Sequence, residues 1–568
     1  MTEPRWWGWG TQDATYDLKD RPLFWPFLTA ALSLTGQERG EVVSLDSIAL
    51  PECRLAEPTV DALRAALGAD AVSVDSNERI RHAYGKSLRD LLRLRRGAVT
   101  NPPDAVVYPD AEERVQAVLE LARRDGFTVV PFGGGTSVTG GVEGLGDRPV
   151  VTLDLRRLGR VLAVDAVSRT AVVQAGIFGP PLEAALNAQG FTLGHFPQSW
   201  EYSTLGGWIA TRSAGQQSTG YGKIEAMVLS LRVVTPAGII QTRTVPASAA
   251  GPLLKELLAG SEGTFGVITQ ATVRLQPLPP RRDYRGVVFR TFPEGVDAVR
   301  EIMQAGAHPV SLRLSDPAET HALLAMQRRH SGFAGWKDAA GKWLLRRQGY
   351  ELAARKPPRP AGAGGACLLI LGCEGQAGAV AAERDRCLSI CRRHGGFHLG
   401  TGVGRQWYGE RFALPYLRDV LLDHGVLTDT LETATVWSNL TGLHVQVSCA
   451  LRDALTNGYV MCHVSHSYAA GASLYFTFLA RGEPGREIEQ WLAAKGAATE
   501  CIMANGGTLS HHHGVGYEHA PWLALEDGSL GVEVLRAAKL ALDPSGLMNP
   551  GKLVLPCARP GMGGQTEE

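Results

Sequence analysis

The feature that most constrains this chain is a run of three consecutive glycines, Gly133, Gly134 and Gly135, which follows the apolar stretch 127–130. Glycine reaches positive φ and carries no side chain, so successive backbone N–H groups of such a loop can point into one concavity that holds an anion. The run has neither the G-x-G-x-x-G spacing nor the lysine of a P-loop. Alone, it indicates either a simple turn or a cradle for a phosphate or pyrophosphate.

Length and charge limit the possible classes of protein. The chain has 568 residues, too many for one hydrophobic core, so two or three domains are expected. Its 57 basic and 57 acidic residues give no net charge, which argues against a nucleic-acid partner. No run of eighteen apolar residues and no signal-peptide pattern is present. The nine cysteines form no Cys-x-x-Cys pair, which favours reduced thiols and predicts a cytoplasmic location.

Three segments near the N-terminus carry predictions of their own. Arg5–Gly10 holds three tryptophans and either docks on the body of the protein or touches a lipid surface; docking is favoured. The apolar patch 22–34 predicts a short helix, and its few basic residues favour core packing over a place at a membrane surface. The stretch 77–97 mixes leucine with arginine and predicts a helix with a solvated basic face.

Two later segments are rich in small residues. Residues 194–222 combine Gly, Ser, Thr and Pro with a few apolar anchors, which is typical of a long functional loop. Residues 260–269 have a similar composition and precede a predicted strand. Small side chains allow a backbone to approach a planar ligand closely.

The most polar cluster is the triple histidine His511, His512 and His513. It could form a metal site, a structural turn, or a site for acid–base work or anion binding. Adjacent histidines do not share a face easily, and no second cluster of familiar metal-ligand spacing accompanies them. We therefore favour acid–base chemistry or anion binding and predict no metal.

Two motifs together, Pro131–Ser137 and Ser261–Ile268, resemble the FAD domain of the vanillyl-alcohol oxidase/p-cresol methylhydroxylase flavoproteins. The tail motif Asn549–Lys552 fits the same pattern. A finer similarity, which covers nearly the whole chain, is to the alkyldihydroxyacetonephosphate synthases. Six motifs carry it: Trp7–Gly10, Gly194–Ser199, Ser203–Thr211, Tyr416–Asp419, Ala470–Phe476 and Asn505–Gly516.

The resemblance implies an α+β chain with the two-domain FAD-binding fold of the p-cresol methylhydroxylase type and an α+β cap (substrate) domain. The expected parts are an N-terminal helical segment (1–100), an FAD-binding domain (101–279), the cap domain (280–505) and a C-terminal segment that closes the FAD site (506–568). Thr136 stands where some relatives carry a flavin-linked histidine, so the FAD is expected to be non-covalent. The residues expected to bind FAD are Pro131, Gly133, Gly134, Gly135, Thr136, Ser137, Pro197, Ser199, Ser203, Thr204, Gly206, Gly207, Thr211, Ala214, Glu262, Gly263, Thr264, Gly266, Val267 and Ile268.

The resemblance also implies a reaction. Such an enzyme exchanges the acyl chain of acyl-dihydroxyacetone phosphate for a fatty alcohol, in ether lipid synthesis, through a bond between the substrate carbon and flavin N5. By position, Tyr475 matches the family's proton-abstracting tyrosine. A phenol with a pKa near 10 must be made more acidic or be given a partner to act as a base. The other implied site residues are His512 and His513 (catalytic), Arg418 (catalytic and substrate-binding), and Arg313 and His511 (substrate-binding).

Two alternatives stay open. One is an FAD-linked D-2-hydroxy acid dehydrogenase or oxidase, which needs an electron acceptor. The other is a flavin-binding protein without activity, which the intact catalytic set argues against. The expected partners are the lipid substrates, a second copy in a homodimer and a peripheral membrane contact. The chain departs from the family at Cys462-His463, where the family has Cys-Arg, and over 320–366; both departures could alter substrate choice.

Overall fold

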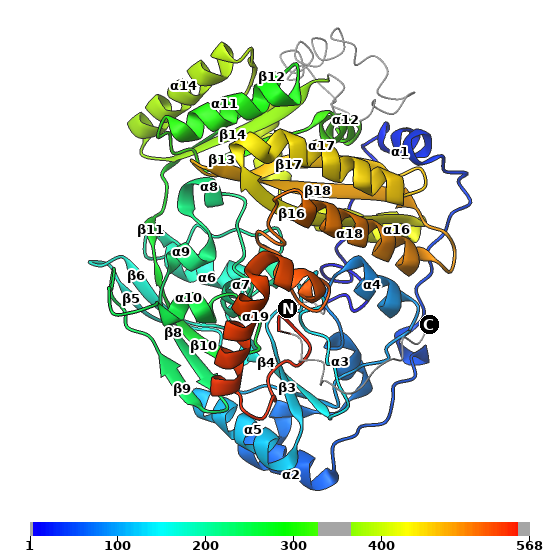
Figure 1. Cartoon of the computed structure of the whole chain (residues 1–568), viewed down its shortest axis with the longest axis vertical. Coiled ribbons are helices and arrows are strands. Elements are labelled where there is room, and N and C mark those ends of the chain that lie inside the picture. The colour runs from blue at the N-terminus through cyan, green and yellow to red at the C-terminus, as the bar shows by residue number, and fades with distance from the viewer. Residues whose placement is uncertain (1–3, 328–364, 555–568) are drawn as a thin grey trace.

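The computed structural model describes residues 4–327 and 365–554, so most of the divergent region 320–366 lies outside the described residues. Figure 1 shows two stacked parts: a large sheet with its helices at the top, and two smaller sheets below it. The expected α+β architecture is confirmed, with helices and strands in both parts.

The first sheet of the lower part carries the glycine loop. It has the order β1-β2-β4-β3, with β2 (Ala105–Val107) and β3 (Thr128–Phe132) parallel to β4 (Val150–Asp154). β1 (Val72–Ser73) adds an antiparallel edge, so the segment before residue 101, expected to be helical, also contributes a strand. These strands are apolar on both faces, as parallel sheets require. Because Gly133 directly follows β3, the loop lies at the carboxyl edge of this sheet, where α/β sheets bind ligands.

The second lower sheet is antiparallel, in the order β5-β6-β10-β8-β9. Its strands are β5 (Val161–Asp165), β6 (Thr170–Gln174), β8 (Val228–Thr235), β9 (Gly238–Gln241) and β10 (Val267–Arg274). A separate two-stranded sheet pairs β7 (Phe191–Thr192) with β11 (Gln276–Pro277). Helices of the lower part include α2 (Glu57–Leu67), α5 (Glu112–Asp125), α6 (Gly179–Asn187), α7 (Leu205–Ala210), α8 (Ser218–Tyr221), α9 (Ile224–Met227) and α10 (Leu254–Leu258).

The cap is a seven-stranded antiparallel sheet in the order β15-β12-β14-β13-β17-β18-β16. Its strands are β12 (Arg281–Phe289), β13 (Ser311–Ser315), β14 (Cys367–Gly375), β15 (Phe397–Gly400), β16 (Val426–Val436), β17 (Tyr459–Ser467) and β18 (Gly471–Arg481). One face forms a large core with α11 (Phe292–Gln304), α14 (Ala377–Arg393), α17 (Trp437–Ala454) and α18 (Glu487–Ala504). α12 (Pro317–Ala325), α15 (Gly402–Glu410) and α16 (Leu414–Asp423) complete the cap.

The two aromatic N-terminal segments dock on the protein, as favoured from the sequence. Trp6 and Trp9 are buried, and the Trp9 backbone N–H donates to Asp419 of α16 at 2.8 Å. The patch 22–34 forms α1 (Phe24–Leu32), whose Phe24 and Phe27 lie in a core shared with α12 and α16. Insertion of this helix into a membrane would expose that core. The prediction that the patch packs in the core is therefore supported.

The prediction of one solvated helix over 77–97 is wrong. The structure has two helices, α3 (Ser76–Arg81) and α4 (Leu88–Arg95), separated by a bend. Two of the arginines are buried rather than solvated, because Arg93 forms a buried ion pair with Glu143 at 2.8 Å and Arg95 pairs with Asp423. Sequence periodicity could not reveal these partners, which lie far away along the chain.

The C-terminal segment returns to the first sheet. After α19 (Leu523–Leu542), the Asn549 backbone N–H donates to the carbonyl of Val129 in β3 at 2.9 Å. The Asn549 side chain donates to the carbonyls of Gly141 and Glu262 at 3.0 and 2.8 Å. The tail motif therefore ties the glycine loop to the 260–269 segment.

Candidate functional site

One cavity of about 430 Å³ lies between the lower part and the cap. The glycine loop, the 197–214 segment and the 262–268 segment form its lower wall. Cap strands β16, β17 and β18 form its upper wall, together with His512 and His513. Segments predicted separately from the sequence thus meet around one space.

The glycine loop forms a backbone nest in this cavity. Within the described part of the chain, no backbone N–H of residues 133–138 donates a hydrogen bond to another residue, and all six residues line the cavity. A Cβ on Gly134 would stand 1.7 Å from the carbonyl oxygen of Tyr202, and one on Gly133 would stand 2.2 Å from Thr204 Oγ1. The loop therefore packs too closely on the 202–204 segment for any side chain, and its free N–H groups suit a pyrophosphate.

The 194–222 segment forms the second element of this wall. It was expected to be a long loop, but it contains α7 and α8. Thr204 caps α7 by accepting the Gly207 N–H at 3.3 Å, and Ser203 accepts the Trp208 indole N–H at 2.7 Å. Small residues lie between these anchors, so the backbone itself lies at the edge of the cavity. The site fits a dinucleotide cofactor that lies along the wall.

Most residues predicted to bind FAD line the cavity; Thr264 and Val267 do not, since both side chains are buried elsewhere. Glu262 lines it but also has a structural role. Its carboxylate accepts the N–H groups of Val515 and Gly516 at 2.6 and 2.7 Å. Burial raises the pKa of Glu262 to about 7, and these hydrogen bonds oppose the rise.

Strand register brings three polar side chains side by side in the cap. Tyr475 of β18 is the direct neighbour of Glu432 in β16 and of His463 in β17. Along β17 and β18 the side chains alternate: Met461, His463 and Tyr475 line the cavity, while the intervening residues enter the helical core. This period of two is a property of extended strands. The sequence motif containing Tyr475 thus faces the same space as the glycine nest.

Glu432 holds the triple-histidine turn. Its buried carboxylate accepts hydrogen bonds from the backbone N–H groups of His511, His512 and His513 at 2.7, 3.0 and 2.9 Å, and from Ser510 Oγ at 2.8 Å. Burial alone would raise the pKa of Glu432, but the histidines and these N–H groups hold it well below its usual range. Burial lowers the pKa of His512 and of His513, so both rings are neutral near pH 7.

Tyr475 lies among these rings. Its ring centroid is 5.9 Å from that of His512, 5.5 Å from that of His513 and 5.0 Å from that of His463. Burial raises the pKa of Tyr475 to about 12, and Thr430 and Arg418 only partly oppose this. The protein therefore does not make the phenol more acidic. Neutral imidazole rings lie beside it, and their role as its proton partners, the second of the two possibilities above, stays a prediction.

The two predicted arginines also line the cavity, each beside a buried carboxylate. Arg313 pairs with Glu319 at 2.7 Å, and Glu319 also contacts His463 Nδ1 at 2.9 Å. Arg418 pairs with Asp429 at 3.3 Å and donates to the Lys86 carbonyl. Arg418 does not pair with its sequence neighbour Asp419, which instead binds Arg5 at 2.8 Å.

His511 is placed differently from its two neighbours. It does not line the cavity, and its ring contacts Tyr468 and His512 instead. The structure thus gives no direct contact between His511 and the space open to a substrate, which the substrate-binding prediction requires.

The far end of the cavity is apolar. Its lining residues come from α1, α12, α16, β17 and β18, and include Phe24, Phe27, Leu323, Met326, Leu417, Leu421, Met461 and Leu479. The N-terminal aromatic helix therefore builds part of the site, a role that composition alone did not indicate. This end suits a hydrocarbon chain.

Sequence reasoning missed several polar lining residues. Lys86 lines the cavity, and burial lowers its pKa to about 8. Glu319 and His466 also line it. The local sequence carries little signal for Glu432, because the strand 426–436 also holds Asp429 and four threonines.

Two trios of possible metal ligands exist among the described residues, His466-His511-His512 and Glu432-His512-His513. In the second trio, both Glu432 oxygens already accept hydrogen bonds from the turn. In the first, the Nδ1 atoms of His511 and His512 face each other at 2.9 Å. The absence of a metal stays a prediction.

Comparison with known proteins agrees with this geometry. Family models match at residues 103–243 (FAD binding domain) and 278–553 (FAD linked oxidases, C-terminal domain). The alkyldihydroxyacetonephosphate synthase of Trypanosoma brucei brucei is 36% identical over 514 residues, which cover 89% of this chain and 82% of that protein. The chain belongs to the alkyldihydroxyacetonephosphate synthase family. A solved structure of an alkyldihydroxyacetonephosphate synthase matches with a TM-score of 0.82 at 31% identity, over 96% of this chain and 97% of the other.

Two predictions are thereby confirmed, the family and FAD as the cofactor. The solved structure of p-cresol methylhydroxylase has the same fold, with a TM-score of 0.68 at 17% identity over 89% of this chain and 99% of the other. Among the described residues, no helix is long and apolar enough to cross a bilayer. The roles of single site residues in this synthase-family chain stay predictions.

Proposed function

We propose that this protein is an FAD-dependent transferase that exchanges the acyl chain of acyl-dihydroxyacetone phosphate for a fatty alcohol. One observation carries the proposal: a single cavity joins a backbone anion nest, a tyrosine–histidine cluster with two arginines, and an apolar end. A substrate with a phosphate, a ketone and a fatty chain needs these three environments. The family to which the chain belongs is named for the same chemistry.

The reaction is balanced without any oxidant. The bond between the carbon next to the ketone and the ester oxygen breaks, and a bond between the same carbon and the alcohol oxygen forms. The fatty acid leaves as a carboxylate, so each turnover releases one proton. When bound, oxidised FAD supplies an electrophilic atom for transient covalent catalysis.

The chain's own residues bind and move protons. Arg313 and Arg418 suit the substrate phosphate, because guanidinium groups make paired contacts with phosphate oxygens. The Tyr475 hydroxyl passes the proton of the substrate carbon to His512 or His513, since a phenol with a pKa of about 12 is not itself an anion near pH 7. Glu432 favours the imidazolium that forms.

The apolar end accommodates one hydrocarbon chain at a time. The acyl chain occupies it first, and the fatty alcohol enters after the carboxylate has left. Met461 of β17 and Leu479 of β18 line this end, on the two strands that also carry His463 and Tyr475. The reacting carbon is thus held where the polar and apolar parts of the cavity meet.

A product assay tests the proposal. The purified flavoprotein receives acyl-dihydroxyacetone phosphate and a radiolabelled fatty alcohol, without an electron acceptor. We expect label in a lipid that survives mild base, and none with Tyr475→Phe. No base-stable product, together with flavin bleaching by a D-2-hydroxy acid under anaerobic conditions, would instead establish the dehydrogenase alternative.

The non-covalent state of FAD, the homodimer, the peripheral membrane contact and the cytoplasmic location stay predictions. Denaturation in acid tests the first, since non-covalent FAD then separates from the protein. Sedimentation with and without vesicles tests the next two.

A further inference from the structure

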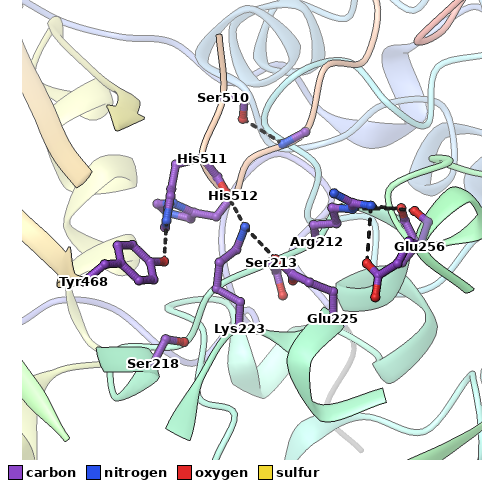
Figure 2. Close-up of polar contacts among 12 residues, drawn as sticks. Arg212, Ser213, Ser218, Lys223, Glu225, Glu256, Tyr468, Ser510, His511 and His512 are labelled. Carbon is purple, nitrogen blue, oxygen red and sulfur yellow. Dashed lines mark hydrogen bonds and ion pairs between the residues drawn. The ribbon is translucent and has the colours of Figure 1, made fainter. Parts of the chain in front are cut away.

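The histidine turn contacts an exposed side chain, Tyr468, through His511. The Tyr468 hydroxyl lies 2.7 Å from His511 Nε2, and His511 Nδ1 lies 2.9 Å from His512 Nδ1 (Figure 2). Tyr468 is 37% exposed, whereas His512 lines the cavity beside Tyr475. Three polar groups therefore connect the reacting space to solvent in an unbroken chain.

We propose that His512, His511 and Tyr468 form a proton path between the cavity and the solvent. The inference rests on the proposed function for its purpose, because that reaction releases one proton per turnover inside the cavity. The path itself is inferred from the two short contacts, Tyr468 to His511 and His511 to His512, and does not depend on which reaction takes place.

The contact between two Nδ1 atoms fixes the protonation pattern of the pair. One ring must donate and the other accept, so the two neutral imidazoles carry their protons on complementary atoms. With His512 Nδ1–H donating to His511, the His511 Nε2–H donates to the Tyr468 oxygen, and the Tyr468 proton points outward. When a proton binds to His512 Nε2, the His512 Nδ1 proton moves to His511 and the His511 Nε2 proton moves to the Tyr468 oxygen. The original Tyr468 hydroxyl proton is then released to solvent.

The charged groups around the path favour transfer of the proton along it over retention of the proton on His511. The Glu432 carboxylate lies 3.5 Å from His512 Nδ1 and stabilises a proton that arrives there. The Lys223 ammonium donates to the His511 carbonyl at 2.6 Å, as Figure 2 shows, and disfavours a second positive charge on His511. Lys223 is itself paired with Glu225 at 3.1 Å.

Two further histidines face the path. His466 stacks on His511 with ring centroids 5.2 Å apart, and its own Nδ1 is buried without a hydrogen-bond partner among the described residues. His513 lies beside His512 at 4.6 Å. Burial lowers the pKa of His511 to about 4, so a proton does not rest on it near pH 7.

The first test is independent of turnover. In the flavoprotein with ¹⁵N-labelled histidine, NMR measures how fast the ring N–H of His512 exchanges with solvent. Tyr468→Phe removes the outer hydroxyl and keeps the ring, and we expect exchange to slow by about tenfold or more. Tyr108→Phe is the matched control, because it removes a half-buried hydroxyl bonded to Glu78 that does not line the cavity.

The second test uses turnover. We expect Tyr468→Phe to lower kcat by about tenfold with KM unchanged, and added imidazole to restore much of the loss. His511→Gln interrupts the same path, so the double variant should be no slower than the slower single one. Flavin content and Tm should match the wild type in Tyr468→Phe.

The outcomes separate the two proposals. Unchanged His512 exchange in both Tyr468→Phe and His511→Gln would overturn the path, whatever the activity. Slowed exchange in a protein that makes no ether product would support the path and sink the proposed function. A loss of kcat that imidazole does not restore and that accompanies a lower Tm would show a structural role and overturn the path.

Discussion

The two walls of the cavity present different chemical groups, backbone on one side and side chains on the other. The lower wall presents backbone N–H groups of a side-chain-free loop, whereas the cap wall presents side chains from three adjacent strands and one turn. A backbone nest is specified by local sequence, because only glycine permits its close packing. The cap wall is specified by strand register, which depends on the whole sheet. A single substitution in the glycine loop should therefore abolish binding at the lower wall, whereas single substitutions in the cap wall should cause partial losses.

The largest effect is expected from Gly134→Ala. The new Cβ would stand 1.7 Å from the Tyr202 carbonyl oxygen, which belongs to the backbone and cannot move aside. We expect loss of FAD binding, measured as the flavin-to-protein absorbance ratio after purification. Gly378→Ala is the control, since a Cβ there meets no atom within 4 Å. A flavin-loaded Gly134→Ala protein would contradict the backbone account of the lower wall.

The next effect concerns the carboxylate that holds the histidine turn. Glu432→Gln replaces one accepting oxygen by an NH₂ group, so we expect the free energy of unfolding to fall by about 3 kcal/mol. Glu526→Gln is the matched control, because Glu526 caps the same segment at Leu509 from the surface, at 2.8 Å. Urea denaturation of the flavoproteins measures both. Equal losses in the two variants would show that the buried carboxylate has no special role.

The buried neutral histidines give the cap wall a pH dependence. Their pKa values are lowered on folding, so the stability that they contribute is present above the unfolded value near 6.5 and is lost as the pH falls towards about 4, the pKa of His511. The free energy of unfolding should therefore fall from pH 7 to pH 4. His511→Gln should make this fall shallower. If the free energy of unfolding fell equally steeply with pH in the wild type and in the variant, His511 would not contribute to the pH dependence.

A graded effect is expected at the arginines. Arg418→Lys keeps the positive charge but loses the planar pair of donors, so KM for acyl-dihydroxyacetone phosphate should rise by about tenfold while flavin content stays normal. Steady-state kinetics at saturating alcohol measure this. An unchanged KM would remove Arg418 from phosphate binding.

The smallest effect is expected at the apolar end. Leu323→Trp fills part of the space beside α12, so kcat/KM for a long fatty alcohol should fall by about fivefold relative to a short one. Competition between a labelled long and a labelled short alcohol reports this ratio directly. A fall that is equal for both alcohols would place the hydrocarbon elsewhere.

These contrasts also explain what the sequence could predict. The glycine loop and the 262–268 segment were recognisable because their chemistry is local. Tyr475, His512 and His513 were assigned by resemblance and meet in the cavity, but their common anchor Glu432 was not found, because it lies in another strand. His511 was placed with its neighbours, whereas a turn of three residues points them in different directions.

The prediction of one solvated helix over 77–97 failed for a related reason. Leucine and arginine over 77–97 suggested a solvated helix, but Arg93 and Arg95 are buried because Glu143 and Asp423 receive them. Such partners are set by tertiary structure and leave no mark in a local pattern. The role of α1 as a cavity wall was hidden in the same way, since an apolar helix looks alike in a core and beside a substrate.

The central claim is that the ether forms by replacing a carboxylate at the carbon next to the ketone. Acyl-dihydroxyacetone phosphate labelled with ¹⁸O in its bridging ester oxygen tests it, with mass spectrometry of both products and no electron acceptor. The account predicts that the released fatty acid carries the ¹⁸O and that the base-stable lipid takes its oxygen from the alcohol. Retention of the ¹⁸O on dihydroxyacetone phosphate, with a fatty ester as the second product, would contradict it.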